Sequence, residues 1–391
     1  MSKLDELVKK LCPNGVYFAP LKDIAEVGTG SSDRINAVDD GKYPFYVRSE
    51  TILRSNRFLF DETAIVIPGE GGIGDIFHYV NGKYDLHQRA YRIRFIDETI
   101  STKYAYYYFS ASFKKFIMMK AVSATVTSIR KPMIEDFKIP LPPLPVQREI
   151  VRILDTFTEL TAELTAELAA RKKQYEYYRD ELLIFGNEVP TVALGSVAAV
   201  TKLAGFEFTK YVNYSNEGSI IALRGLNVKN GKLDLHDVKY VDSSDFSKLN
   251  RSKLYVGDML FTYVGTIGQV ALVDEADRYY LAPNVALIRA NTSRLIPEFM
   301  RYYFQSNQFW KNQIMRLLQS SSMQNIPMEK IRKFELPIPS LEEQRRIINL
   351  LNRFDTLCND ITTGLPAEIE ARKKQYEYYR DKLLSFPEAK A

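Results

Sequence analysis

An internal repeat constrains the fold of this chain more than any other feature of its sequence. The segment Ala-Arg-Lys-Lys-Gln-Tyr-Glu-Tyr-Tyr-Arg-Asp occupies residues 170–180 and recurs unchanged at residues 371–381. Weaker matches extend the duplication outward, among them a proline-rich segment that ends at Leu144 in the first half and at Leu341 in the second. The sequences between these landmarks differ. The chain therefore divides into two similar halves, each with a variable module followed by a shared helical region.

Both repeated regions have the pattern of long amphipathic helices. Apolar residues recur at every third or fourth position through residues 144–186 and 341–391, as in helices that pack along a coiled-coil seam. A helix of about 40 residues is about 60 Å long. Its apolar stripe needs a partner, so we expect the two helices to pack on each other. The second region has four additional residues, which include Gly364 and Pro366, and we expect these to kink or break the helix.

The variable modules have a mixed pattern of strands and helices. Short runs rich in β-branched and aromatic residues alternate with glycine-containing turns, and a segment rich in tyrosine and phenylalanine follows, near residues 102–119 and 297–318. This pattern predicts an α+β fold. We expect a short N-terminal helix, a first module, a first helical region, a second module and a second helical region, at residues 1–14, 15–143, 144–186, 187–340 and 341–391.

The composition excludes several classes of protein. Of the 391 residues, 46% are hydrophobic and 26% are charged, as in an ordinary globular protein. No apolar run reaches the roughly 18 residues that a membrane helix needs, and the N-terminus lacks the apolar core of a signal peptide. We therefore expect a cytoplasmic protein with no membrane partner. The two cysteines and three histidines are too few and too scattered to predict a disulfide framework or a metal site.

Motifs of catalysis are weak or missing in the sequence. Gly69, Gly71 and Gly74 have the spacing of a dinucleotide-binding loop, but the following residues have the pattern of a strand, whereas such a loop must lead into a helix. We interpret these glycines as a hairpin loop, which can also approach a DNA backbone closely. The chain has no phosphate-loop motif and no methyltransferase motif. We therefore expect no catalytic residues, no metal and no cofactor on this chain.

Polar residues at matching places in the two modules are the best candidates for a binding site. The net charge is +5 and the basic excess lies in the modules, which fits weakly basic DNA-binding modules. Arg48 matches Arg224 in position, and Gln88 matches Asn284; arginine suits guanine and an amide suits adenine. With the neighbouring polar and glycine-rich segments, the predicted DNA-binding residues are Arg48, Arg54, Gly72, Gln88, Arg89, Thr127, Arg130, Lys131, Arg224, Asn227, Thr266, Gln269, Asn284, Ser322 and Gln324.

The repeated helix ends carry tyrosines that could stack on bases. Their helical spacing instead favours the seam between the helices or an interface with another protein. We therefore predict a partner interface at Tyr175, Tyr178, Tyr376 and Tyr379.

Over essentially its full length the chain resembles the specificity subunits of type I restriction–modification enzymes. The resemblance rests on the order of modules and helical regions, on the helix starts Leu-Pro-Pro-Leu-Pro-Val-Gln-Arg and Ile-Pro-Ser-Leu-Glu-Glu-Gln-Arg, and on the repeated helix end. It implies two target-recognition domains separated by two long antiparallel coiled-coil helices, with a pseudo-twofold repeat. Each domain would read one half of a split, asymmetric site in double-stranded DNA.

The same resemblance implies partner subunits. Two methyltransferase subunits would dock on the helical regions and bring S-adenosylmethionine, and restriction subunits would bring ATP and Mg²⁺. This chain would then be a non-catalytic recognition subunit. Methylation would fall on an adenine that the partner flips out of the stack. If the helices set the domain separation, loss of one Thr-Ala-Glu-Leu unit, residues 161–164, shortens it by about 6 Å, or one or two base pairs of unread spacer at about 3.4 Å each.

Other functions stay open on the sequence alone. A coiled-coil scaffold with protein-binding modules predicts no sequence-specific DNA binding, even with partner subunits. A single-chain methyltransferase or nuclease predicts action on DNA without partners. An inactive or phase-variable allele of the same family also fits the sequence. Neither the target bases nor the spacer length follow from the sequence.

Overall fold

The chain folds into two compact units that each draw on both halves of the repeat. The computed structural model describes residues 2–120, 128–319, 325–360 and 362–389. Unit 1 comprises Met1–Thr165 and Glu368–Ala391, and unit 2 comprises Ala166–Ala367. Because the division falls inside the helical regions, each unit contains one variable module and a part of both helical regions.

Unit 1 is built on a six-stranded sheet with the strand order β2-β7-β5-β6-β3-β4. Its neighbouring strands are antiparallel except for β3 and β6, which are parallel. Ahead of the long helices, the elements of unit 1 are α1 (Lys3–Leu11), β1 (Phe18–Pro20), α2 (Leu21–Ile24), β2 (Ala25–Thr29), η1 (Arg34–Asn36), β3 (Tyr43–Tyr46), β4 (Leu53–Ser55), β5 (Phe60–Pro68), β6 (His78–Leu86), β7 (Ala90–Phe95), α3 (Thr102–Lys120), α4 (Lys131–Glu135) and β8 (Lys138–Pro140).

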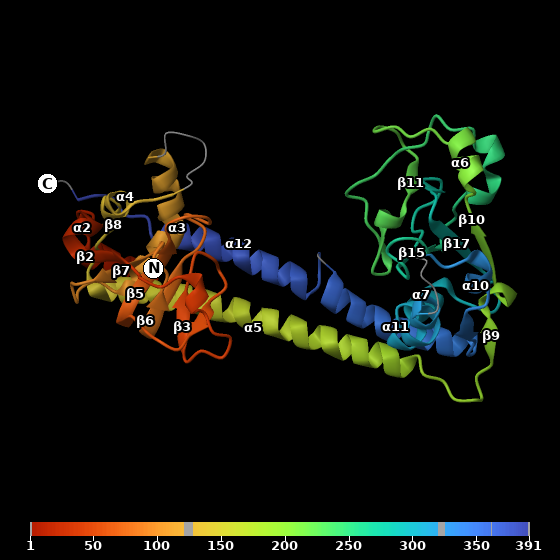
Figure 1. Cartoon of the computed structure of the whole chain (residues 1–391), viewed down its shortest axis with the longest axis horizontal. Coiled ribbons are helices and arrows are strands. Elements are labelled where there is room, and N and C mark those ends of the chain that lie inside the picture. The colour runs from red at the N-terminus through yellow and green to blue at the C-terminus, as the bar shows by residue number, and fades with distance from the viewer. Residues whose placement is uncertain (1, 121–127, 320–324, 361, 390–391) are drawn as a thin grey trace. The chain divides into compact units, whose positions relative to one another are not determined.

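The core of unit 1 lies on both faces of strand β5. Successive side chains of a strand point to opposite faces, and β5 is buried on each. Ile65 and Ile67 pack against Phe109 and Phe113 of α3, the helix that lies against the sheet in Figure 1. On the other face, Val66 joins a smaller cluster with aromatic residues of β3 and β6. The centre of the sheet is therefore buried on both faces.

Unit 2 repeats this plan with a smaller sheet. The main sheet has the antiparallel order β10-β17-β14-β15, and β11 pairs in parallel with β16. The elements of its module are β9 (Thr191–Ala193), η2 (Leu194–Ser196), β10 (Ala198–Lys202), α6 (Gly205–Tyr211), β11 (Ile221–Leu223), η3 (Gly225–Asn227), β12 (Val228–Lys229), β13 (Lys232–Leu233), η4 (Phe246–Lys248), η5 (Asn250–Ser252), β14 (Met259–Thr262), β15 (Val270–Leu272), β16 (Tyr279–Leu281), β17 (Val285–Ala290), α7 (Pro297–Phe304), α8 (Asn307–Phe309), η6 (Trp310–Met315), α9 (Arg316–Gln319), α10 (Met328–Arg332) and β18 (Glu335–Pro337).

The two helical regions differ in continuity. The first is one helix of 39 residues, α5 (Leu144–Leu182). The second is divided into α11 (Leu341–Asn359) and α12 (Leu365–Leu383). A side chain at Gly364 would lie 2.4 Å from the carbonyl oxygen of Thr356, so a close backbone turn at this point requires glycine. The expected break near Gly364 is confirmed.

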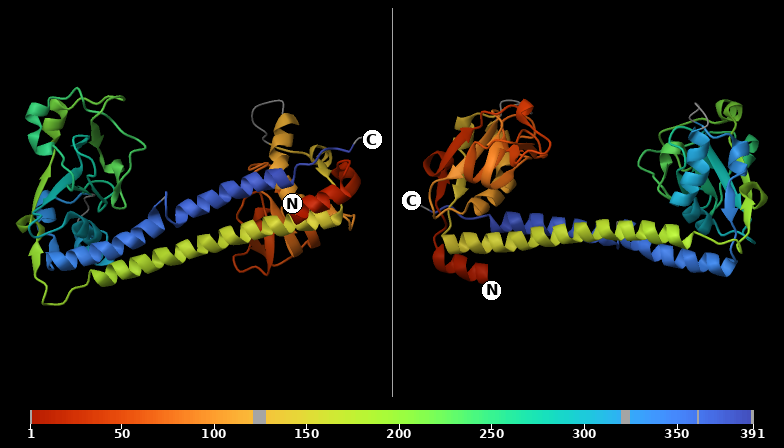
Figure 2. Two further views of the ribbon diagram at one scale, coloured as in Figure 1. Left: turned by 180° about the vertical axis from the view of Figure 1, so that it is seen from behind. Right: turned by 60° about the horizontal axis from the view of Figure 1, so that its bottom comes forward.

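Within each unit, α5 packs antiparallel to a helix of the second region (Figure 1, Figure 2). In unit 1, Phe157 of α5 stacks on Tyr379 of α12, with ring centroids 5.6 Å apart. In unit 2, Phe354 of α11 stacks on Tyr178 of α5, also at 5.6 Å. The two phenylalanines are equivalent in the repeat, as are the two tyrosines, so the second stack is the first with the helices exchanged. The predicted α+β fold with an internal repeat and antiparallel helices is confirmed.

Candidate nucleic-acid interface

A pair of parallel strands positions the matched polar residues in each unit. In unit 1, Phe45 and Tyr46 of β3 pair with the last two residues of β6, and the chain continues from these strands to Arg48 and Gln88. The carboxyl ends of parallel strands lie at the same sheet edge. The structure therefore brings Arg48 and Gln88 to one edge of the sheet in unit 1.

Unit 2 has the same construction. Strand β11 pairs in parallel with β16 over its full length, and Arg224 and Asn284 follow these two strands. Asn284 is exposed and has a φ of +68°, a conformation that asparagine tolerates better than most residues. We call Arg48, Gln88 and Arg89 the strand-end residues of unit 1, and Arg224 and Asn284 the strand-end residues of unit 2.

Acidic side chains hold the strand-end residues of unit 1. Glu70 accepts hydrogen bonds at Oε2 from Nη1 of Arg48, at 3.0 Å, and from Nη1 of Arg89, at 2.9 Å. These two arginines, Arg89 foremost, hold the pKa of the Glu70 carboxyl below its usual range. Gln88 donates from Nε2 to Oδ2 of Asp33 at 2.9 Å. Two guanidinium groups and one amide are thus fixed beside each other on an exposed edge.

A buried histidine, His87, holds the backbone at this edge of the sheet. His87 is 4% exposed, its backbone N–H donates to the carbonyl of Tyr46 at 3.0 Å, and its Nδ1 accepts from the backbone N–H of Arg89 at 3.0 Å. Burial lowers the pKa of the His87 imidazole, so the ring is a neutral acceptor near pH 7. This arrangement fixes the backbone that carries Gln88 and Arg89.

The glycine-rich loop of unit 1 connects two antiparallel strands, β5 and β6. Its Gly71, Gly72 and Gly74 have φ values of +64°, +58° and +76°, which non-glycine residues rarely adopt. The predicted hairpin loop is confirmed, since a strand follows it. Glu70 forms a β-bridge with Ser128, so the basic segment that continues to Arg130 and Lys131 starts beside this loop.

A hollow of about 430 Å³ lies at the strand ends of unit 2. Arg224, Thr266 and Asn284, three predicted DNA-binding residues, line it together with aromatic and apolar side chains. The Arg224 guanidinium donates from Nη2 to the carbonyl oxygen of Asp237 at 2.8 Å and to its Oδ1 at 2.9 Å. Polar donors beside an apolar wall can bind both the edge and the methyl groups of bases.

Residues 13–171 and 187–371 each match the model of the type I restriction modification DNA specificity domain. The chain belongs to this family. The specificity subunit of the Escherichia coli type I restriction enzymes EcoR124I and EcoR124II is 36% identical over 265 residues, which span 64% of this chain and 63% of that subunit. The match to this relative therefore spans less than two thirds of its length.

Two further similarities agree with this family. A Haemophilus influenzae protein, a putative type I restriction enzyme specificity subunit, is 31% identical over 320 residues, or 79% of this chain and 75% of that protein. The crystal structure of the type I restriction–modification S subunit from M. genitalium has a TM-score of 0.56, with 13% identity over 95% of this chain and 96% of that chain. The second similarity shows a shared fold.

Three of the residues predicted to contact DNA make hydrogen bonds within the loops of this chain. Asn227 is fully buried, and its Oδ1 accepts from the backbone N–H of Arg224 at 3.1 Å. Arg54 donates to the carbonyls of Gly41 and Lys42. Gln269 accepts at Oε1 from the backbone N–H of Asn230. The burial of Asn227 corrects the expectation that its amide reads a base. Arg54 and Gln269 support their loops and stay predicted contacts.

The remaining predicted DNA-binding residues lie in the basic segment that leads into α4 and in the polar segment before α10. Arg130 is exposed, and Lys131 lies 3.5 Å from Glu135 in an ion pair. Thr127, Ser322 and Gln324 lie outside the described residues. The sequence prediction missed the acidic partners Asp33, Glu70 and Asp237, because their pairing depends on which loops meet in space.

The repeated tyrosines divide into packed and exposed residues in this family member. Tyr175 is 8% exposed and belongs to the core of unit 2, so the interpretation as an interface with another protein does not fit it. Tyr178 and Tyr379 take part in the inter-helix stacks and are partly exposed. Tyr177 and Tyr378 are 60% and 63% exposed. The exposed face of the repeated segment therefore centres on a tyrosine that the prediction omitted.

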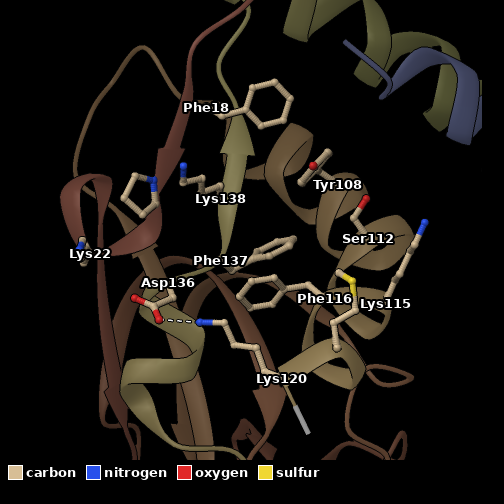
Figure 3. A pocket seen from close by; sticks show the side chains of 12 residues that line it. Phe18, Lys22, Tyr108, Ser112, Lys115, Phe116, Lys120, Asp136, Phe137 and Lys138 are labelled. Carbon is tan, nitrogen blue, oxygen red and sulfur yellow. Dashed lines mark hydrogen bonds and ion pairs between the residues drawn. The ribbon is translucent and has the colours of Figure 1, made fainter. Parts of the chain in front are cut away.

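A second hollow, of about 630 Å³, lies on unit 1 of this specificity-family chain (Figure 3). An ion pair between Lys120 and Asp136, 2.6 Å long, crosses it. The glycine-rich loop contacts another face of α3, where Lys114 pairs with Asp75. This hollow, which we call the groove of unit 1, and the glycine-rich loop thus lie on different faces of α3. The residues that line the groove are Phe18, Pro20, Lys22, Tyr108, Ser112, Lys115, Phe116, Met119, Lys120, Asp136, Phe137 and Lys138.

No group of three or more His, Cys, Asp or Glu side chains in the described part of the chain could hold a metal ion. Among the helices formed by described residues, none is long and apolar enough to cross a membrane.

Proposed function

We propose that this chain recognises a split, asymmetric DNA site and directs adenine methylation or restriction by partner subunits. The matched strand ends carry this proposal, because each unit presents an arginine and an amide at the ends of two adjacent parallel strands. Arginine reads guanine through two parallel hydrogen bonds, and an amide reads adenine in the same way. Two different reading groups in one chain would give two different half-sites.

We assign the two target-recognition domains to residues 15–143 and 187–340. The domains would be held by a short N-terminal helix at residues 1–14 and by the helical regions at residues 144–186 and 341–391. The helical regions would also bind the partner subunits. The proposed reading groups are the strand-end residues, with Thr266 beside Asn284. Gly72, Arg130 and Lys131 suit contacts with the DNA backbone, since backbone amides and basic side chains bind phosphate.

We further propose that the chain itself is non-catalytic and acts in the cytoplasm. Two methyltransferase subunits would bind S-adenosylmethionine, and restriction subunits would bind ATP and Mg²⁺. The exposed faces of the repeated segments, with Tyr177 and Tyr378 at their centres, are equivalent surfaces, as two copies of one partner would require. Tyrosine is enriched at such interfaces.

Selection from random duplexes tests this function. The complex of this chain with the methyltransferase subunits of its host would be incubated with random duplex DNA, and the bound fraction sequenced. The proposal predicts two enriched half-sites at a fixed spacing. Enrichment of one continuous motif, or none from a stable complex, would contradict the proposal and favour a scaffold.

A further inference from the structure

Every strand-end side chain that donates hydrogen bonds in unit 1 is held by an acidic residue from another loop. Glu70 binds Arg48 and Arg89 through one carboxylate oxygen, and Asp33 binds Gln88. The two arginines come from sequence positions 22 and 19 residues away from Glu70. Glu70 is therefore a shared anchor for two groups that the backbone alone would not align.

Unit 2 uses the same device from a different position. In the repeat, the residue that corresponds to Glu70 is Val264, which forms the matching β-bridge with Asn325. The carboxylate that holds Arg224 comes instead from Asp237, in another loop. Val264 is apolar and cannot pair with an arginine. Each unit therefore has a carboxylate on its arginine, but the two carboxylates come from different places in the repeat.

The pairs of unit 1 stabilise the fold little. The side chains of Arg48 and Arg89 are 44% and 57% exposed, and that of Glu70 is 36% exposed. Solvent and salt weaken ion pairs at such exposed positions. Each guanidinium has five N–H donors, and Arg48 uses only Nη1 in its bond with Glu70. The remaining donors of Arg48 can bind a base while the carboxylate holds the group in place.

A carboxylate beside a reading arginine also affects binding to any DNA sequence. The phosphate backbone is negative, and its attraction to lysine and arginine supplies most non-specific affinity. A carboxylate that neutralises part of the arginine charge reduces this attraction. A guanine edge still binds, because its oxygen and nitrogen acceptors are uncharged and need only correctly oriented donors.

We propose that Glu70 and Asp237 are specificity-determining positioning residues, which orient the reading arginines of units 1 and 2 and suppress their binding to DNA of other sequences. This inference rests on the proposed function as a DNA-recognition subunit. It assigns one acidic residue to each half-site. Loss of either carboxylate therefore relaxes the choice of bases in one half-site and leaves the other unchanged.

The test compares Glu70→Gln and Asp237→Asn in the complex with the methyltransferase subunits. Binding is measured at one salt concentration to three duplexes: the selected site, the site with the first half scrambled, and the site with the second half scrambled. One arginine–base pair gives at least about fivefold discrimination, and E70Q keeps the arginines while it loosens their position. We therefore expect E70Q to lose roughly five- to tenfold of its discrimination against a scrambled first half. D237N should do the same for the second half.

Two further variants separate positioning from general charge effects. Asp61→Asn removes one exposed negative charge at the start of β5, the end of the strand far from Glu70, and should keep wild-type discrimination. Glu70→Asp keeps the carboxylate and should recover part of what E70Q loses. Equal discrimination by E70Q and the wild type, or equal effects of D61N and E70Q, would overturn the inference. A wild-type complex with no preference among the three duplexes would instead overturn the proposed function.

Discussion

Gln147 and Gln344 occupy equivalent positions at the starts of α5 and α11 and make the same set of hydrogen bonds. In unit 1, Oε1 of Gln147 accepts from the backbone N–H of Ser101 at 2.8 Å. Its Nε2 donates to the carbonyls of Thr99 and Pro142, at 3.0 and 2.7 Å. One buried amide thus ties α5 to the loop before α3 and to the proline-rich segment before α5.

Gln344 repeats each contact in unit 2. Its Oε1 accepts from the backbone N–H of Ile296 at 2.8 Å, and its Nε2 donates to the carbonyls of Arg294 and Pro339, each at 2.9 Å. Both side chains are buried, at 1% exposure or less. The repeated glutamine therefore sets how each module is joined to its helical region.

Replacing either glutamine by alanine should destabilise its own unit. The variant leaves a backbone N–H and two carbonyls without their partner, and the carbonyl of the proline before the helix, Pro142 or Pro339, is in a buried hydrogen bond. A buried unsatisfied group costs about 1–3 kcal/mol. We expect Gln147→Ala and Gln344→Ala each to lower the midpoint of denaturant unfolding. The exposed neighbours offer matched controls, Arg148→Ala and Arg345→Ala, which should change stability by at most about 0.5 kcal/mol. Glutamine variants as stable as these controls would contradict the assignment.

The two rings of each inter-helix aromatic stack should be energetically coupled to each other. A double-mutant cycle on Phe157 and Tyr379 should give a coupling free energy of about 0.5–1.5 kcal/mol, the range for aromatic pairs, and the cycle on Phe354 and Tyr178 should agree with it. The control cycle combines Phe157 with Tyr178, which lie on the same helix about 30 Å apart at 1.5 Å per residue. Those two changes should be additive; coupling in the control equal to that in the stacks would refute the pairing.

Arginine geometry, and not charge alone, should decide base reading. Arg48→Lys keeps the positive charge but loses the planar fork of donors, so discrimination at the first half-site should fall by about 1–3 kcal/mol, with little change in the salt dependence of binding. Arg224→Lys should do so at the second half-site. Lys115→Glu, in the groove of Figure 3, should leave the recognised motif unchanged. Competition binding with scrambled half-sites measures all three, and a motif altered by K115E would contradict the assignment.

Acid should weaken the attachment of α1 to α5. Hydrogen bonds from Arg152 and Lys3 hold the pKa of Glu149 at about 2, whereas its ordinary value is 4.5. A folded-state pKa below the unfolded value gives stability that is complete above pH 4.5 and is lost as the pH falls towards 2. We expect the unfolding free energy of Glu149→Gln to depend less on pH across this window than that of the wild type. Parallel pH profiles for the two proteins would contradict this role.

The helix length should set the spacing of the two half-sites. Deletion of residues 161–164 removes one turn from α5, or about 6 Å. We expect the unread spacer to shorten by one or two base pairs of about 3.4 Å each, with both half-sites unchanged. Sequencing of the methylated sites in cells that express the deletion variant measures the spacer. A variant with an altered half-site and the original spacer would refute this hypothesis.

The repeat made the strand-end residues of the candidate site predictable, but not their acidic partners. Equivalent segments fold alike, so the matches of Arg48 with Arg224 and of Gln88 with Asn284 pointed to equivalent strand ends. The acidic partners could not be found in this way, because Asp33 lies 55 residues from Gln88 and the two meet through the parallel bridge between Ser32 and His87.

Burial explains the other differences from the predictions. Asn227 has the composition of a reading residue, yet its amide is fully buried and holds the loop of Arg224. Periodicity placed Tyr175 correctly on the apolar face of α5, but it could not tell the packed seam from an interface with another protein. The division of the second helix was predictable, because Gly364 and Pro366 both disfavour a continuous helix.

Sequencing of DNA methylation tests the central claim most directly. Cells that express this chain with the methyltransferase subunit of its host would be compared with cells that lack this chain. The proposed function predicts a new adenine mark in a split motif with a fixed spacer, present only when the chain is expressed. No new mark, despite a stable complex of the two proteins, would contradict it.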